Sequence, residues 1–325
     1  WKTTTRMRKT RNPGKKRRGR VPMAYAPFNA LSRLSLSRLD RSTNQGLDAL
    51  DGASMKTKDG STVIVSDLRD LENAWLALQP HWMIQPSPKP LPSTPVYTAL
   101  RMFLSPILRP LLRWRIRGAE HIPRQGATIL AANHLSHIDP IAVIAAARRT
   151  THYLAKDGHF SNPLTSFLMR ATGQIETHRE AGGSDALASA ATILDQGCAL
   201  GIFPEGTRSK RTEPPFLLPG KTGVARLAAA YPHAVVVPLA LVGTREVMQP
   251  QHHKFPRLWR RIDVNAARGV TWLEWLSSER GGNQSPSSLL ALSECEEHEV
   301  RAELSRLYRQ FTDQLMGTLA ASGAP

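Results

Sequence analysis

From residue 119 onward, short apolar runs alternate with longer runs in which apolar residues recur at helical spacing. The runs "ATILAAN" and "HAVVVPLALVG" have the length of buried strands, whereas 184–196 repeats leucine and alanine every three or four residues. Strands that alternate with helices are typical of a largely parallel sheet with both faces covered. The pattern therefore predicts one α/β domain over residues 119–270, with a largely parallel, partly mixed sheet flanked by helices.

Two amphipathic segments flank this predicted domain. Before it, 97–118 combines an apolar stripe with five arginines, and Pro106 and Pro110 predict a kink or a break in the helix. Such a segment lies either in a membrane interface or against the core with its arginines outward. After the domain, 271–325 begins with a polar loop and ends in a predicted helix, 296–322, whose apolar face we expect to pack on the domain.

The first 96 residues have a different composition. Ten of the 43 Lys and Arg residues fall in residues 1–20, which contain no acid, so 1–22 is predicted to be a basic, disordered tail. Residues 23–96 carry only short strand-like and helix-like patterns, and 85–95 holds five prolines and is predicted to be a linker. The tail either binds an anionic surface, membrane or nucleic acid, or is simply solvated.

Cysteine usage and hydropathy restrict where the protein works. Cys198 and Cys295 are far apart and stand in no C-x-x-C motif, which predicts neither a disulfide framework nor a cysteine-based zinc site and fits a reducing compartment. The basic tail is not followed by the apolar stretch of a secretory signal. No apolar run approaches the ~18 residues of a spanning helix. We expect a cytoplasmic protein, attached peripherally to the inner face of a membrane.

The stretch "AANHLSHIDP", residues 131–140, places a polar cluster at the end of a predicted strand. A histidine with a carboxylate partner acts as a general base, because the carboxylate sets the tautomer and orientation of the ring. His134 and Asp139 have a spacing that allows this contact. Asp139 before a proline is also typical of a helix start, and His134 alone is equally typical of a loop. The pair by itself is therefore a weak signal.

Two further strand ends carry polar residues. "GIFPEGTRS", 201–209, places a glycine, an acid and Arg208 directly after an apolar run, and an arginine fork matches the oxygens of a phosphate. "GQIETHR", 173–179, ends another short strand with Arg179. Each arginine alone is typical of a surface turn. Because the carboxyl ends of parallel strands meet at one edge, the two together predict an anion site near His134 and Asp139.

Taken in order, these segments resemble the motif blocks of the glycerolipid acyltransferase family, most closely the 1-acylglycerol-3-phosphate acyltransferases. The resemblance covers about 98–250, and a later run, "VVVPLALVGT", resembles a fourth block. The matching positions are Asn133, His134, Ser136 and Asp139, then Lys156, then Gly173, Ile175 and Arg179, and finally Glu205, Gly206, Thr207 and Arg208.

The resemblance implies the following chemistry. His134 would take the proton of an acceptor hydroxyl that attacks an acyl thioester, and Asp139 would orient the histidine. Asn133, Ser136 and Lys156 would support the pair. The partners would be a lysophospholipid, foremost lysophosphatidic acid, and acyl-CoA or acyl-carrier protein, at an anionic membrane surface. No metal, no other cofactor and no covalent acyl-enzyme is implied. The acceptor phosphate would be held by Arg179, Glu205, Gly206, Thr207 and Arg208.

Some features depart from the family pattern and leave alternatives open. A proline-rich insertion, "KRTEPPFLLP", follows the third block, and "RIDVNAARGVTW" lacks a Gly-x-Pro that is common in the family. A different lysophospholipid or polar acceptor is one alternative, and an inactive membrane-binding module is another. A nucleic-acid-binding protein is a third, but no helix-turn-helix, zinc-finger or aromatic RNA-binding pattern is present, so no specific nucleic acid is expected.

Overall fold

A computed structural model gives the fold of the 325-residue chain. The residues that it describes are 54–56, 62–91, 97, 99, 102–103, 106, 110, 113–156, 174–177, 183–249, 257 and 259–325. The predicted tail 1–22 and much of the predicted helical segment 97–118 lie outside these residues.

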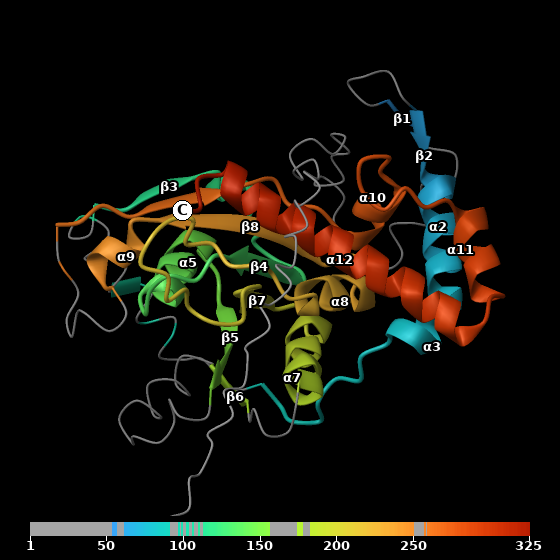
Figure 1. The fold of residues 1–325 in the computed structure, drawn as a ribbon, viewed down its shortest axis with the longest axis horizontal. Coiled ribbons are helices and arrows are strands. Elements are labelled where there is room, and N and C mark those ends of the chain that lie inside the picture. The colour runs from blue at the N-terminus through green and yellow to red at the C-terminus, as the bar shows by residue number, and fades with distance from the viewer. Residues whose placement is uncertain are drawn as a thin grey trace, which may run out of the picture.

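The centre of the molecule is a seven-stranded mixed sheet (Figure 1). Every neighbouring pair is parallel except β8 and β9, which are antiparallel. The predicted fold class, an α/β domain with a largely parallel and partly mixed sheet, is confirmed. In spatial order the strands are β3 (Arg115–Arg117), β9 (Asp263–Ala266), β8 (Val235–Val242), β4 (Thr128–Ala132), β7 (Ala199–Ile202), β5 (Thr151–Lys156) and β6 (Ile175–Thr177).

Both faces of the sheet are buried, which explains the continuous apolar runs. On β4, Ile129 and Ala131 face one hydrophobic cluster, and Leu130 and Ala132 face the other. A strand with two buried faces needs apolar residues at every position. The first face is covered by α7 (Gly183–Asp195), α8 (Gly223–Ala230) and α12 (Glu297–Ala321), and the second by α5 (Asp139–Ala147) and α9 (Thr244–Val247).

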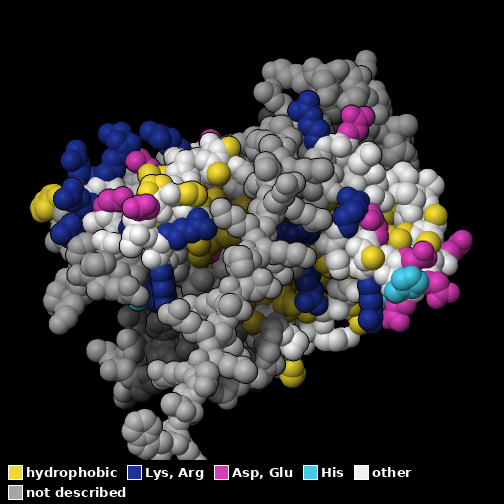
Figure 2. Space-filling view, in the orientation of Figure 1, with side chains coloured by type: hydrophobic (Ala, Val, Ile, Leu, Met, Phe, Trp, Pro, Cys, Tyr) yellow, Lys and Arg dark blue, Asp and Glu magenta, His cyan; other side chains and the backbone are white. Residues whose placement is uncertain are grey.

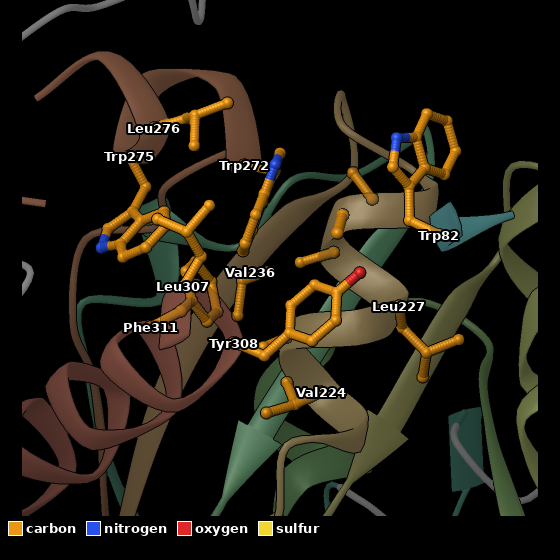
Figure 3. Close-up of a cluster of buried hydrophobic side chains, with 14 of the residues drawn as sticks. Trp82, Val224, Leu227, Val236, Trp272, Trp275, Leu276, Leu307, Tyr308 and Phe311 are labelled. Atoms are coloured by element: carbon orange, nitrogen blue, oxygen red, sulfur yellow. The ribbon is translucent and has the colours of Figure 1, made fainter. Parts of the chain in front are cut away.

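A layer of further helices packs beyond α8 and α12. It contains α2 (Val65–Ala77), α3 (Gln79–Trp82), α10 (Trp272–Ser277) and α11 (Pro286–Ser293), and α2 and α11 lie side by side at one end of the molecule (Figure 1). Their contacts form an aromatic cluster, part of which is drawn in Figure 3. We use this name for Trp75, Trp82, Trp272, Trp275 and Phe311. Each of these rings contacts at least one other ring of the cluster, and the centroids of contacting rings lie 4.9–5.5 Å apart.

The indole N–H groups of the aromatic cluster are mostly paired. Trp75 donates to the carbonyl of Ala229 on α8 at 3.0 Å, and Trp275 donates to Gln314 on α12 at 2.5 Å. Local signals start the short helices: Thr271 and Glu274 form a capping box at α10, which satisfies two otherwise unpaired backbone N–H groups. The layer therefore joins α2 to helices near the end of the chain.

Several segments differ in detail from the sequence-based expectations. Residues 23–96 include a 13-residue helix, α2, and a small antiparallel pair, β1 (Ser54–Lys56) and β2 (Thr62–Ile64). Arg115–Arg117, placed in the segment before the domain, is an edge strand of the sheet and pairs with β9. The predicted terminal helix is α12, 25 residues long and packed on the domain through residues such as Leu304 and Phe311.

The strand directions define one functional edge. Strands β4, β7, β5 and β8 are mutually parallel, so their carboxyl ends meet at the same edge, which we call the catalytic edge because the residues expected to be catalytic follow β4 there. Because β9 runs antiparallel to β8, and β3 runs parallel to β9, these two strands begin at that edge instead. The segments just before β3 and β9 therefore lie on the same side of the sheet as the ends of β4 and β7.

Candidate active site

The polar cluster after β4 forms a histidine–carboxylate pair. Nδ1 of His134 lies 2.9 Å from Oδ2 of Asp139. The same oxygen accepts the backbone N–H groups of Leu135 and Ser136, each at 2.6 Å. An oxygen with two such donors is acting as an acceptor, so Nδ1 carries the proton and the neutral ring keeps a lone pair on Nε2. The ring is thus prepared to accept a proton on the side away from Asp139.

Asp139 shapes the turn that presents the histidine. It is the first residue of α5, and Ile138 holds the capping position without a side-chain hydrogen bond. The Asp139 side chain reaches back to the turn at Leu135 and Ser136 and does not cap its own helix. Its carboxylate also lies in the first turn of α5, where the helix dipole favours negative charge. Asp139 is fully buried, whereas the His134 side chain keeps 18% of its accessible surface.

Glu205 fixes the backbone of His134. Its Oε1 accepts the backbone N–H of His134 at 2.6 Å, and its Oε2 accepts that of Leu218 at 2.8 Å. The N–H of Ser209 donates to the His134 carbonyl at 3.0 Å. Both backbone groups of His134 are therefore held by the segment that follows β7. With both oxygens occupied by backbone groups and only 2% exposure, Glu205 has the contacts of a positioning residue and not those of a phosphate ligand.

Burial changes the electrostatics of this carboxylate. It raises the pKa of Glu205 to about 7, an effect partly opposed by the hydrogen bonds from His134 and Leu218 and by Arg211, and reinforced by Asp139. Desolvation also lowers the pKa of Arg208, and the charge of Asp139 acts in the opposite direction. Arg208 therefore lies within the electrostatic reach of the histidine–carboxylate pair.

The turn of residues 203–209 is shaped by a glycine. Gly206 has a φ of 70°, a left-handed conformation that suits glycine, and an added Cβ would lie 2.9 Å from the Lys221 side chain. Arg208 is partly buried and its Nη1 contacts the ring of His137. Thr207 is exposed. The turn brings Arg208 and Lys221 to the catalytic edge, where two cations beside a histidine suit an anionic substrate.

Two neighbouring residues of the first motif hold the loop to β8 and to the chain beyond it. The Asn133 side chain donates to the carbonyl of Leu241 at 3.0 Å and accepts its N–H at 2.7 Å. The Ser136 hydroxyl donates to the carbonyl of Met248 at 2.7 Å. Both side chains are buried, and both bind backbone groups far away in sequence. Their contacts are those of side chains that hold the loop in place.

Phe203 and Tyr153 are part of the site, although the sequence analysis did not select them. The Phe203 ring stacks on the His134 ring, with centroids 3.9 Å apart and planes 12° from parallel. Tyr153 stacks on Phe203 from β5, at 5.6 Å. The position of Phe203 directly before "PEGTRS" was the only available signal. A ring that packs on the imidazole limits its rotation, which helps to fix Nε2.

The remaining predicted site residues are less fully defined. Lys156 is the last residue of β5, at the catalytic edge, and Ile175 begins β6. Gly173 and Arg179 lie outside the described residues, so the predicted role of Arg179 stays a prediction. Among the described residues, no group of three or more His, Cys, Asp or Glu side chains is arranged to hold a metal ion.

Comparison with known families finds a match that includes this site. Residues 113–242 match the family model described as Acyltransferase. That range contains His134, Asp139, Glu205 and Arg208, together with six of the seven strands of the sheet. Over these residues the chain is therefore similar to proteins of the Acyltransferase family.

The chain is also similar to individual named proteins. A chloroplastic 1-acyl-sn-glycerol-3-phosphate acyltransferase, LPAT1 of Arabidopsis thaliana, is 28% identical over 46% of this chain and 41% of its own length. A protein with the same enzyme name from Borreliella burgdorferi is 31% identical over 29% of this chain and 39% of its own. The chain thus spans about two fifths of the length of these relatives.

A solved structure of the same class is also similar. It is the 1-acyl-sn-glycerophosphate acyltransferase PlsC from Thermotoga maritima, with 17% sequence identity and a TM-score of 0.42. The similarity covers 77% of this chain and 96% of that one.

Proposed function

We propose that this protein transfers a fatty acyl group from acyl-CoA or acyl-carrier protein to lysophosphatidic acid, giving phosphatidic acid. The observation that carries the proposal is the His134–Asp139 pair at the end of β4, whose geometry leaves Nε2 of the ring free to accept a proton. The names of the relatives suggest the acceptor.

The reaction follows from a base beside an anion-binding turn. Nε2 of His134 takes the proton of the acceptor hydroxyl as its oxygen attacks the thioester carbonyl carbon. The tetrahedral intermediate then collapses, the carbon–sulfur bond breaks, and the imidazolium returns the proton to the leaving thiolate. The products are an ester and a free thiol. A general base of this kind contributes about 10²–10⁴-fold to the rate.

We assign the acceptor phosphate to the turn of residues 206–208. The Arg208 guanidinium supplies a planar pair of donors, Gly206 allows close approach of the backbone, and the exposed Thr207 hydroxyl is a further donor. Lys221, next to Gly206, adds positive charge. Arg179 belongs to the same proposed site on the basis of its motif. Glu205 holds His134 in place and contributes indirectly.

The decisive experiment is an acyl-transfer assay of the purified protein. Lysophosphatidic acid is compared with lysophospholipids that carry other head groups, each with acyl-CoA and acyl-carrier-protein donors of two chain lengths. We expect turnover to be highest with lysophosphatidic acid. A clear preference for another acceptor would replace the proposed substrate but keep the reaction class. Lack of transfer to every acceptor would overturn the function.

Access to a lipid substrate requires contact with a membrane, and no helix in the described part of the chain is long and apolar enough to span one. The catalytic edge carries a suitable surface. In the turn before β9, Trp259 is 70% exposed and lies among the exposed Arg257, Arg260 and Arg261. Figure 2 shows Lys and Arg side chains gathered on the side of the molecule that carries β3. Arginines around an exposed tryptophan suit an anionic lipid interface.

We therefore propose that the protein attaches peripherally, at the cytoplasmic face, with the catalytic edge toward the lipid. The exposed Met102 and Phe103, in the predicted amphipathic segment, belong to the same proposal. Sedimentation with vesicles that contain anionic lipid tests it. Each arginine contributes roughly 1 kcal/mol, and salt screens that attraction.

Two variants separate charge from apolar contact in this assay. Replacing Arg257, Arg260 and Arg261 with Gln should weaken binding mainly at low salt. Trp259→Ser should weaken binding at low and high salt alike. Leu290→Ser is the control, because Leu290 is 49% exposed on α11, in the layer of helices away from the sheet. Equal effects of the Trp259 and Leu290 changes would exclude this turn as the docking surface.

A further inference from the structure

Two buried polar atoms beside the histidine–carboxylate pair have no hydrogen-bond partner within the part of the chain that the structure describes. One is Oδ1 of Asp139, an acceptor, and the other is the hydroxyl of Tyr153, which can donate. Asp139 is fully buried and Tyr153 is 5% exposed. Buried polar groups are nearly always satisfied, by protein or by ordered water, so a complementary pair of unsatisfied atoms calls for an explanation.

The position of the Tyr153 ring is built into the sheet. Tyr153 lies on β5, opposite Gly201 of the neighbouring strand β7. A Cβ atom added at Gly201 would lie 2.1 Å from Cζ of the tyrosine ring. Only a glycine leaves room for the ring at this place. The hydroxyl-bearing end of Tyr153 is therefore held directly over β7, the strand that leads into Phe203 and Glu205.

Tyr153 is connected to the catalytic pair in two ways. Its ring stacks on Phe203, which in turn stacks on His134. Burial, and to a smaller extent electrostatic interaction with Tyr97 and with the charge of Asp139, raise the pKa of the Tyr153 hydroxyl well above its usual value. The hydroxyl therefore keeps its proton at all ordinary pH values and remains a donor within the electrostatic reach of Asp139.

We propose that Tyr153 is a positioning residue for the catalytic pair, and that its hydroxyl donates toward Oδ1 of Asp139 across one buried water. The carboxylate would then be held on both oxygens: Oδ2 by His134 and the turn, and Oδ1 by Tyr153. A water there would have at least two polar partners, Oδ1 of Asp139 and the Tyr153 hydroxyl, as buried waters require. The role in catalysis rests on the proposed acyl transfer, whereas the hydrogen-bond connection does not.

The connection explains a requirement of the proposed mechanism. Rotation of the Asp139 side chain would release Nδ1 of His134 and the N–H groups of Leu135 and Ser136 together. A second anchor on Oδ1 opposes that rotation. Tyr153 thereby supports the orientation of the imidazole through Asp139, while Phe203 restrains the imidazole by stacking on its ring.

The test compares Tyr153→Phe with Tyr97→Phe. The first change removes one hydroxyl and keeps both stacked rings. The control removes another buried hydroxyl at the start of β5, where Tyr97 donates to the carbonyl of Arg149 and accepts the N–H of Thr151. For Tyr153→Phe we expect kcat to fall about tenfold, the size of one hydrogen bond to a charged group, with unchanged KM for both substrates. Tyr97→Phe should leave kcat within about twofold.

A second readout is independent of turnover. In protein labelled with ¹⁵N-histidine, the Nδ1–H proton of His134 is assigned by its loss in His134→Ala. We expect its chemical shift to change in Tyr153→Phe and to stay unchanged in Tyr97→Phe. An unmoved resonance together with unchanged kcat in Tyr153→Phe would overturn the proposal, and so would equal changes in both variants.

The two proposals fail in different ways. If the wild-type protein transfers no acyl group, the proposed function fails, and the resonance alone decides whether Tyr153 supports Asp139. If the wild-type protein is active and Tyr153→Phe has the same kcat and the same His134 Nδ1–H chemical shift, the proposed function is retained and the proposed role of Tyr153 is rejected. A crystal structure gives a direct check: a water within hydrogen-bond distance of both oxygens is expected.

Discussion

The catalytic edge and the aromatic cluster are held together by different interactions. At the edge, buried polar side chains bind backbone groups: Asp139, Glu205 and Asn133 together accept five N–H groups outside regular strand and helix pairing. The cluster is held by ring contacts, with Trp75 and Trp82 stacked 4° from parallel. Hydrogen bonds are directional, whereas apolar burial is not. The first region therefore fixes geometry, and the second mainly supplies stability.

His134→Ala should produce the largest loss of activity and should leave stability nearly unchanged. We expect kcat to fall by about 10²–10⁴-fold, because the general base is lost, with little change in the free energy of unfolding. Turnover and circular dichroism are measured on one preparation. His298→Ala, an exposed change on α12, is the control and should keep wild-type activity. Activity of His134→Ala within tenfold of wild type would end the general-base assignment.

Trp75→Ala should produce the reverse pattern. Trp75 is fully buried, so we expect unfolding to become easier by about 3–5 kcal/mol, while the folded fraction turns over at nearly the wild-type rate. Urea denaturation gives the stability, and activity is measured well below the unfolding temperature. Leu76→Ala, at the next position of α2 and 43% exposed, should cost less than about 1 kcal/mol. If Trp75→Ala lost turnover at unchanged stability, the aromatic cluster would contribute directly to activity at the catalytic edge.

Glu205→Gln should affect both stability and the geometry of the catalytic edge. Glu205 is a buried acid, and it also positions His134. Its pKa of about 7 lies above the ordinary value of 4.5, so the folded state binds a proton more tightly than the unfolded state. This contribution to stability is present below pH 4.5 and is lost as pH rises to 7, by up to about 3 kcal/mol.

The difference in unfolding free energy between wild type and Glu205→Gln should therefore shrink as pH rises from 4.5 to 7. Urea denaturation at several pH values measures it. Glu294→Gln, an exposed change, should show a constant difference. A pH-independent difference for Glu205→Gln would mean that burial does not raise this pKa in the folded protein.

Arg208→Lys should have the smallest of these effects. It should separate the use of the phosphorylated acceptor from the use of the thioester donor. Lysine keeps the charge but loses the planar fork, so we expect kcat/KM for the phosphorylated acceptor to fall about tenfold. The value for the thioester donor should change little. Arg301→Lys, on the exposed face of α12, is the control. Equal losses for both substrates would argue against a phosphate role for Arg208.

The catalytic edge was predictable from sequence to the extent that its motifs are local. His134 and Asp139 are five positions apart, so one turn suffices to bring them together, and the alternation of runs was enough to place them at a strand end. The contacts of Glu205 were not predictable. An acid in a polar turn is ordinarily solvated, and only the packed structure shows that it binds backbone groups from two distant segments.

The aromatic cluster was largely invisible in the sequence. The run "LRDLENAWLALQ" predicts a helix, but nothing local indicates that Trp75 contacts Trp272. Tyr153 was missed for a related reason: its significance comes from Gly201 on a neighbouring strand. Strand order and helix docking depend on contacts between distant residues, which periodicity does not encode. The edge strand β3 was hidden in the same way inside a run of arginines.

The bond from Trp75 to Ala229 has a consequence for the newborn chain. The two residues are 154 positions apart, and at 5–20 residues per second the ribosome needs roughly 10–30 s to make the chain between them. Helices α10, α11 and α12 emerge later still. During that interval the indoles of α2 and α3 have each other but lack their native partners on α8 and α10, and a chaperone that shields exposed aromatic side chains would find its target there. Synthesis rate, as well as sequence, would then influence how much active protein a cell obtains.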